Sequence, residues 1–155
     1  MADNLIQIDI DDANLNRLLK ELRKKGEDFS PVTKEIANYL YLISDETFDN
    51  ESAFDGTPWD RLADSTVKAK GHDRKLYDDG DMRDSLSEDS DGGKAIVGLN
   101  VISDDGYPYA VVHQFGTDDE RVPARPFLPF DEENQLYEGA KDEIIDLVRD
   151  FLEDI

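Results

Sequence analysis

Residues 107–130, YPYAVVHQFGTDDERVPARPFLPF, form the most aromatic and proline-rich stretch of the chain. An apolar run ends at Gly116, and a short acidic turn joins it to a second run that contains three of the six prolines. Proline fixes its own backbone angle φ and restricts the residue before it, so the second run has a stiff backbone. The stretch therefore predicts a fixed surface, and we interpret that surface as an assembly contact.

The length and composition limit the class of protein. A chain of 155 residues is long enough for one domain with a buried core. The absence of cysteine excludes disulfides, thiolate chemistry and cysteine-based zinc sites. No apolar segment approaches about 18 residues, and none follows a basic N-terminal flank, so we expect neither a membrane span nor a signal peptide. We therefore expect a soluble protein that is made in a cytosol.

The net charge of −21 is the strongest global feature, and Asp is the commoner acid. Affinity for phosphate comes from Lys and Arg that displace counterions, so the chain should be repelled by free duplex DNA. Its self-repulsion destabilises a compact state in dilute salt. At about 1 M salt the Debye length falls to roughly 3 Å and this repulsion largely disappears. The composition is compatible with a halophilic source; the alternative is an ordinary acidic protein that its charge keeps soluble.

The pattern of apolar residues predicts both helices and strands. Apolar residues spaced by three and four predict helices over residues 11–25, 30–50, 60–70 and 131–155. Alternation of apolar and polar residues predicts a half-buried strand over residues 5–10, and the apolar residues of 94–101 predict a second strand, with residues 87–93 as an acidic hairpin loop. Because helices and strands occur in mixed order, the fold class is α+β.

We expect residues 1–155 to form a single domain, with residues 45–57 as a candidate flexible acidic arm. Trp59 follows this arm and is interpreted as a core anchor, because Trp buries a large area wherever it packs. A basic cluster lies just beyond it, at Lys68, Lys70, Arg74 and Lys75. The cluster is either a solvated face or a contact for an acidic neighbour.

No set of residues predicts catalysis or metal binding. Carboxylates are too abundant to single out a catalytic pair, and an acid within an acidic loop is usually solvated. The calcium-loop pattern fails at each acidic stretch that contains a glycine. The chain also lacks a zinc-helix His pair, a phosphate-binding glycine loop that ends in Lys, and a Gly-x-Ser-x-Gly elbow. We therefore expect no enzyme activity, no metal site and no cofactor.

Two residues of the 107–130 stretch carry polar chemistry. We interpret His113 as a structural residue that makes hydrogen bonds to fix the turn at Gly116; a pH sensor at an interface and a catalytic base are the alternatives. Arg125 is preorganised by Pro123 and Pro126, and its guanidinium suits a bidentate pair with a carboxylate. That carboxylate can belong to the same chain or to a neighbouring subunit.

Four groups of residues follow one another in a fixed order. They are Pro58-Trp59 with Leu62, Thr66 and Lys70; Leu76, Gly80, Met82 and Ser85-Leu86; Tyr109-Ala110 with His113-Gln114-Phe115-Gly116; and Val122-Pro123-Ala124-Arg125-Pro126-Phe127-Leu128. In these groups the chain resembles the phage virion morphogenesis family, the Mu-type tail-completion and neck proteins of tailed viruses. The resemblance covers residues 58–131, and its most specific part is the third group together with the fourth. The chain departs from the motif at Met82, where the family usually has leucine.

The resemblance implies an α+β fold in which an antiparallel sheet packs against N-terminal helices and a long C-terminal helix, as in tail-terminator and neck proteins. It implies a structural virion protein of a tailed virus that acts in tail completion or head–tail joining, with no enzyme activity and no cofactor. It also implies a homo-oligomeric ring at the tail–neck junction, and we expect a hexamer. The implied partners are the tail tube protein and the neck or connector proteins.

The implied location is the virion, with the host cytoplasm as the place of assembly. An acidic ring suits a DNA channel, because repulsion lets the duplex pass without specific binding. The competing interpretation is a stand-alone acidic binding module, such as a DNA mimic that occupies a basic site of a host protein. A hydrolase that depends on His113 is the third.

The motif residues are expected to have two roles. Structural roles are expected for Trp59, Gly80, Tyr109, His113, Phe115 and Gly116. Positions at a subunit interface are expected for Pro123, Arg125, Pro126 and Phe127. We therefore expect residues 109–116 to form core and turn, and residues 122–130 to meet a neighbouring subunit.

Overall fold

The computed structural model describes residues 13–26, 28–76, 81–91, 94–99, 109–119, 121–131, 133 and 135–154. The helices within these residues are α1 (Ala13–Lys24), α2 (Ser30–Asn50), α3 (Asp64–Lys70), α4 (Asp81–Asp84), α5 (Tyr109–Phe115) and α6 (Glu138–Glu153). The strands are β1 (Ser87–Ser90) and β2 (Ala95–Gly98), which form an antiparallel pair. The α+β class predicted from the sequence is confirmed.

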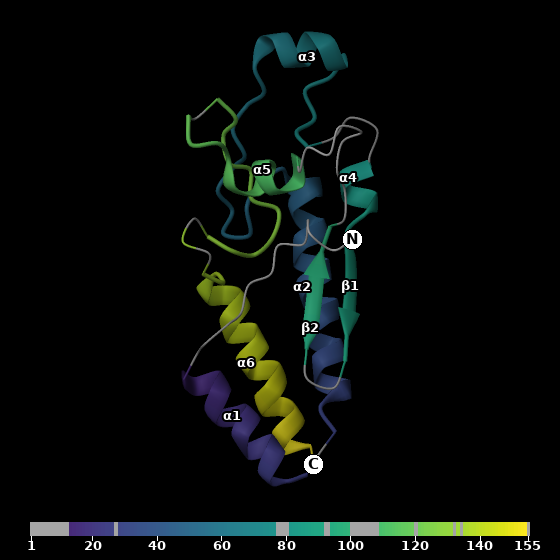
Figure 1. Ribbon diagram of the computed structural model, residues 1–155, viewed down its shortest axis with the longest axis vertical. Helices are drawn as coiled ribbons and strands as arrows, with labels where there is room; N and C mark the ends of the chain where they lie inside the picture. Colours follow the sequence, from purple (N-terminus) through teal and green to yellow (C-terminus); the bar gives the residue numbers. More distant parts are fainter. Residues whose placement is uncertain are drawn as a thin grey trace.

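The elements form an elongated molecule around α2 (Figure 1). The β1–β2 hairpin lies along α2, and α6 contacts α2 as well as α1. Helices α1 and α6 make up one end of the molecule, and α3 projects at the opposite end (Figure 1). None of the described helices is both long enough and apolar enough to cross a membrane.

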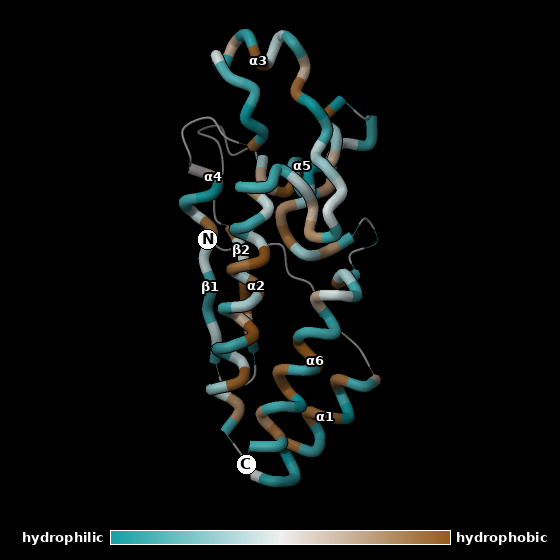
Figure 2. The backbone as a smooth tube through the Cα atoms, turned by 180° about the vertical axis from the view of Figure 1, so that it is seen from behind, coloured by the Kyte–Doolittle hydropathy of each residue, from teal (hydrophilic) through white to brown (hydrophobic). Residues whose placement is uncertain are grey.

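The end formed by α1 and α6 is held by two apolar stripes. The stripes comprise Leu15, Leu18 and Leu22 of α1 and Ile144, Val148 and Leu152 of α6, all buried. Their spacing of three and four places them on one face of each helix. Burying a Leu or Ile side chain contributes about 2 kcal/mol, so this packing accounts for much of the stability at this end. Figure 2 shows the matching brown segments along both helices.

The start and the end of α2 are set by local chemistry. Asp28 accepts hydrogen bonds from the backbone N–H and the hydroxyl of Ser30, at 3.0 and 2.7 Å. Pro31 follows in the first turn, where its missing N–H has no intrahelical partner to lose. The helix ends at Asn50, and the capping residue Glu51 adopts a left-handed φ of 49°. Residues 45–50, the first part of the predicted acidic arm, therefore belong to α2.

Residues 51–58 form a closed turn after α2. Ser52 and Pro58 make an isolated β-bridge, and the Ala53 N–H donates to the Thr57 carbonyl at 2.8 Å. Ala53 is buried. The flexibility that the sequence suggested for this region stays a prediction.

The hairpin starts earlier than the sequence predicted. Residues 87–90 were expected in a loop, but they pair as β1 with β2, from Ser87 opposite Gly98 to Ser90 opposite Ala95. The tight turn is closed by the Asp91 N–H, which donates to the Lys94 carbonyl at 3.0 Å. The Thr33 hydroxyl of α2 donates to the Asp91 carbonyl at 2.6 Å, so the turn is fixed to α2. The sequence pattern did not predict β1, because the strand consists of polar residues only and so shows no alternation of apolar and polar side chains.

Two predicted helices begin later in the structure. Helix α6 begins at Glu138 instead of residue 131, because the Asp131 carboxylate accepts the Glu133 and Gln135 N–H groups, each at 2.9 Å, in a local turn. Helix α3 begins at Asp64 instead of residue 60. The predicted strand over residues 5–10 lies outside the described residues.

Candidate functional site

Residues 109–115 of the third motif group form a helix, α5, which was not predicted from the sequence. The helix ends at Gly116, whose φ of +73° suits a left-handed glycine cap, and the Gly116 N–H donates to the Val112 carbonyl at 2.6 Å. Only Ala110 and Gln114 of α5 are buried. Phe115, expected in the core, is 38% exposed. This surface position corrects its predicted role.

Gly116 lies directly against the fourth motif group. A β-carbon at this position would be 2.9 Å from both the Ala124 amide nitrogen and the Val122 carbonyl oxygen. The Thr117 N–H donates to the same Val122 carbonyl at 3.0 Å. The structure therefore requires glycine here for two reasons: the left-handed φ and the close backbone approach.

The buried side chain of Gln114 joins the two groups. Its Oε1 accepts the backbone N–H groups of Phe127 and Leu128, at 3.1 and 2.9 Å. Two backbone donors identify this atom as the oxygen, because the amide nitrogen cannot accept them. The Arg125 N–H donates to the His113 carbonyl at 2.7 Å, beside these bonds. Gln114 was not singled out from the sequence, although its spacing of four from Ala110 is typical of one buried helix face.

The first motif group meets the fourth through Trp59. The Trp59 indole N–H donates to the Pro126 carbonyl at 2.9 Å, and the ring is buried. Phe48 of α2 packs edge-on against Trp59, with ring centroids 5.9 Å apart, and also packs against Phe127 at 5.7 Å. Trp59 therefore anchors the 122–128 segment to α2.

Arg125 and Phe127, two of the predicted interface residues, are buried within the chain, at 5% and 0% exposure. The Arg125 guanidinium donates to the backbone carbonyls of Asp60 and Arg61, at 2.9 and 3.2 Å. Burial lowers its pKa, and the nearby charge of Asp60 acts in the opposite direction. The bidentate carboxylate pair predicted for Arg125 is wrong: its partners are main-chain oxygens of the same chain. Pro123 and Pro126 are half-buried, and their interface role stays a prediction.

His113 is a neutral residue at pH 7. Burial lowers its pKa to about 4, with further contributions from the positive charges of Arg125 and Lys70. Its Nδ1 is buried and has no hydrogen-bond partner among the described residues. The side chain therefore does not make the predicted bonds to the turn at Gly116; the His113 carbonyl oxygen contacts the fourth group instead.

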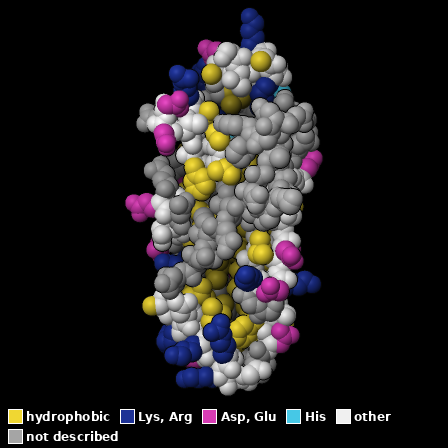
Figure 3. All heavy atoms as spheres, viewed as in Figure 1, with side chains coloured by type: hydrophobic (Ala, Val, Ile, Leu, Met, Phe, Trp, Pro, Cys, Tyr) yellow, Lys and Arg dark blue, Asp and Glu magenta, His cyan; other side chains and the backbone are white. Residues whose placement is uncertain are grey.

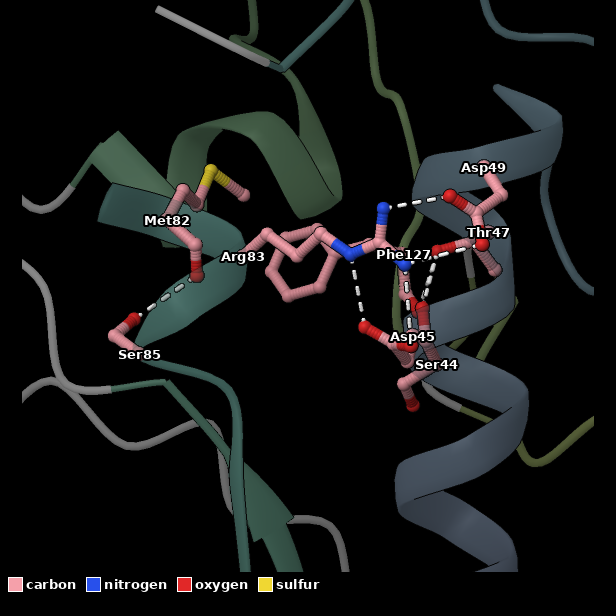
Figure 4. A network of polar contacts seen from close by, with 8 residues as sticks. All are labelled: Ser44, Asp45, Thr47, Asp49, Met82, Arg83, Ser85 and Phe127. Atoms are coloured by element: carbon pink, nitrogen blue, oxygen red, sulfur yellow. Dashed lines mark hydrogen bonds and ion pairs between the residues drawn. The ribbon is translucent and has the colours of Figure 1, made fainter. Parts of the chain in front are cut away.

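The second motif group attaches to α2 through Arg83 (Figure 4). The Arg83 guanidinium spans two carboxylates one helical turn apart, contacting Asp45 at 2.9 Å and Asp49 at 2.7 Å. These bonds raise the pKa of Arg83, and the Arg83 hydrogen bond lowers that of Asp49. Thr47 lies between these two aspartates in the sequence of α2; its hydroxyl donates to the Ser44 carbonyl at 2.6 Å and also lies 3.3 Å from the Phe127 carbonyl. Gly80, the remaining predicted residue of this group, lies outside the described residues.

The first, third and fourth motif groups thus converge on one buried region, and the second is attached to α2 beside it. We call it the motif junction, defined as Trp59, Gln114, Gly116, Arg125 and Phe127. Its polar atoms are used in bonds between chain segments, except the Gln114 Nε2, which has no partner among the described residues. Chemically, the arrangement fixes the backbone of residues 122–128 and the start of the α3 region.

A groove of about 630 Å³ opens beside the motif junction. Its lining includes the apolar side chains of Ala53, Pro58, Trp59, Ala124 and Pro126, together with Tyr137. Four carboxylates also line it, those of Asp55, Asp60, Asp131 and Glu133. Nowhere in the described part of the chain do three His, Asp or Glu side chains gather as metal ligands would.

The comparisons with known proteins agree with the motifs. No curated protein and no solved structure matches this chain significantly. The model of the phage virion morphogenesis family matches residues 10–153, nearly the whole sequence. The match extends well beyond the residues 58–131 that carry the four motif groups. The chain therefore belongs to the phage virion morphogenesis family.

Proposed function

We propose that this chain is a structural protein that completes the tail, or joins it to the head, of a tailed virus. In this role several copies form a ring at the tail–neck junction, and six is the expected number. The ring contacts the tail tube protein on one side and neck or connector proteins on the other. It has no enzyme activity and needs no cofactor.

One observation carries the proposal: three of the four motif groups, including the most specific two, converge on a buried junction. Trp59, Gln114 and Arg125 direct their polar atoms at backbone groups of the chain itself. A substrate site would instead present such atoms to an open pocket, with the pKa values of some of them shifted toward the working pH. The one shifted histidine, His113, has a pKa of about 4, too low for a general base near neutrality. The motif residues thus fix the conformation of the chain, and a protein that assembles with other copies needs such a fixed surface.

The charge supports the same role. A net charge of −21 opposes binding to duplex DNA, since binding requires cations that neutralise phosphates. A ring of such chains around a channel lets DNA pass without adhering to the wall. Virion assembly in the host cytoplasm and incorporation into the virion follow from the proposal.

The test is deletion of the gene from the virus, followed by electron microscopy of the lysate. The proposal expects filled heads and tails that remain separate, or tails of irregular length, and rescue by the gene supplied in trans. Mass spectrometry should find the protein in purified wild-type virions. Normal virions after deletion would contradict the proposal. Recovery of the protein in a 1:1 complex with one basic host protein, and not in virions, would favour the acidic binding module.

A further inference from the structure

Helix α3 is exposed in a way that a contact with another molecule would explain. It lies between Leu62 and Leu76, which are both buried, yet none of its own seven residues is buried. Figure 1 shows it projecting beyond the rest of the molecule. We call residues 63–75 the α3 arm.

The α3 arm makes hydrogen bonds within itself, such as that from the Lys70 ammonium to the Arg74 carbonyl at 3.0 Å, but no residue of α3 is buried by packing. Isolated helices shorter than about 12 residues are marginal in water, and most helices in proteins depend on packing. The α3 arm has a left-handed cap at Gly71, whose N–H donates to the Val67 carbonyl at 2.8 Å, and a surface ion pair between Arg61 and Asp64. A surface pair of this kind contributes at most about 1 kcal/mol. A surface that covers the helix would supply the missing packing.

The base of the α3 arm is nevertheless fixed firmly. On one side, Arg125 of the motif junction binds the carbonyls of Asp60 and Arg61. On the other side, the Lys75 N–H donates to the Glu51 carboxylate at 2.6 Å. These two attachments therefore fix the direction in which α3 projects from the molecule. Arg125, predicted as an interface residue, acts on the interface indirectly, as a positioning residue.

The charge of the α3 arm is opposite to that of the chain as a whole. Lys68 and Lys70 lie in the last turn of α3, and Arg74 and Lys75 follow it. Figure 3 shows Lys and Arg side chains at both ends of the molecule and Asp and Glu side chains along its flanks. The other basic end is that of α1, which buries its three leucines against the core and so has a partner already.

The groove beside the motif junction carries negative charge, which is complementary to the positive charge of the α3 arm. Its lining mixes apolar side chains with the carboxylates of Asp55, Asp60, Asp131 and Glu133, which form no ion pair among the described residues. A mixed apolar and acidic groove suits a short helix with Val67 on its surface and lysines beside it.

We propose that the α3 arm of one copy docks in the groove of the next copy. The α3 arm and the groove are different patches of the same chain, so the contact is heterologous and repeats head to tail, which closes into a ring when the rotation allows. The inference rests on the proposed ring and names the surfaces that build it. A second copy is the favoured occupant because the chain carries an acidic groove of its own, and because its net charge of −21 opposes approach of the α3 arm to DNA.

Two charge-reversed chains test this contact. The first, Lys68→Glu with Lys70→Glu, makes the α3 arm acidic and leaves the groove acidic. The second, Asp55→Lys with Asp60→Lys and Glu133→Lys, replaces three of the four groove carboxylates, so the groove becomes basic while the α3 arm stays basic. Either chain alone has like charges at the contact, whereas a 1:1 mixture can alternate around a ring with every contact complementary. Lys20→Glu with Lys24→Glu, on exposed positions of α1, is the control with the same charge change as the first.

Native mass spectrometry and light scattering at about 0.15 M salt measure the assembly, and circular dichroism verifies that each chain is folded. We expect each reversed chain to associate at least about tenfold more weakly than the unmodified chain, the mixture to recover assembly, and the α1 control to assemble normally. Normal assembly of either reversed chain alone, or a mixture that stays unassembled, would overturn the contact and leave the ring itself standing. An unmodified chain that remains monomeric even at high concentration would overturn both. If the unmodified chain binds duplex DNA and the chain with Lys68→Glu and Lys70→Glu does not, the α3 arm contacts nucleic acid and the proposed contact between copies is wrong.

Discussion

The α-carbon of Gly116 lies so close to Ala124 that a β-carbon on Gly116 would be 2.9 Å from the Ala124 amide nitrogen. Real β-carbons essentially never approach backbone atoms so closely, and the other atom at this distance, the Val122 carbonyl oxygen, is also backbone. This contact joins the end of α5 to the 122–128 segment, and it cannot relax by a side-chain rotation.

Gly116→Ala should therefore destabilise the chain strongly, by more than about 3 kcal/mol, because the left-handed φ and the steric overlap act together. Urea unfolding followed by circular dichroism measures the change. Gly71→Ala is the matched control: Gly71 has a similar φ of +79°, but nothing lies within 4 Å of its added β-carbon. We expect the control to lose only about 1 kcal/mol. Equal losses in the two variants would show that the close approach is not the cause.

Gln114→Leu should cost about 2–4 kcal/mol, because it leaves the buried N–H groups of Phe127 and Leu128 without an acceptor in exchange for an apolar side chain of similar size. Hydrogen exchange of these two amides should accelerate in the variant. Gln135→Leu, at an exposed position, is the control and should be nearly neutral. An unchanged free energy of unfolding in Gln114→Leu would mean that water replaces the lost oxygen.

Arg83 and Asp45 should be energetically coupled, because the guanidinium contacts both carboxylate oxygens, at 2.9 and 3.1 Å, and both side chains are about two-thirds or more buried. A double-mutant cycle with Arg83→Met and Asp45→Asn measures the coupling, and we expect about 1 kcal/mol. The same cycle on Arg149 and Asp146, an exposed pair at 3.3 Å, should give less. A larger coupling for the exposed pair would argue against a role for Arg83 in fixing α4 to α2.

His113 should make the stability depend on pH. Burial holds its folded pKa at about 4, below the value of 6.5 of an unperturbed histidine, so the unfolded state takes up the proton first as the pH falls. The contribution is fully present above about pH 6.5 and is lost progressively toward pH 4, to a total of roughly 3 kcal/mol.

The measurement is urea unfolding of the wild type and of His113→Gln between pH 7 and pH 4. The wild type should lose more stability over this range than the variant, whose residue 113 does not titrate. An NMR titration of the His113 imidazole should place its midpoint well below 6. A midpoint near 6.5 would show that the ring is more exposed than the structure indicates.

Salt should stabilise the chain if its acidity is an adaptation to concentrated salt. At a net charge of −21 the self-repulsion is strong in dilute buffer and is screened at about 1 M salt and above. Thermal unfolding in dilute buffer and in about 3 M KCl should therefore give a clearly higher midpoint in KCl. Sodium sulfate is an unsuitable substitute, because it also strengthens apolar burial. Equal midpoints in dilute buffer and in KCl would remove the argument for a halophilic source.

The sequence by itself determined the elements whose causes are local. The apolar spacing of α1, the proline in the first turn of α2 and the run of β-branched residues in β2 act over a few residues, so their positions were predicted closely. The four motif groups likewise identified the family, because their order along the chain is a property of sequence. The start of α6 was predicted seven residues too early, since the Asp131 turn that precedes it interrupts an otherwise suitable helical pattern.

The tertiary structure alone decided what the motif residues do. Arg125 has flanking prolines, and its sequence context favoured a carboxylate partner. Only the fold brings the carbonyls of Asp60 and Arg61 within reach, 65 and 64 residues away in the sequence. Phe127 was expected at a surface contact, but in the fold it is fully buried and packs against Phe48 of α2. A pattern of residue types sets which interactions each side chain is capable of. Which of them it makes depends on long-range packing, and here that packing buries Arg125 and Phe127 within the chain and leaves every residue of α3 outside the core.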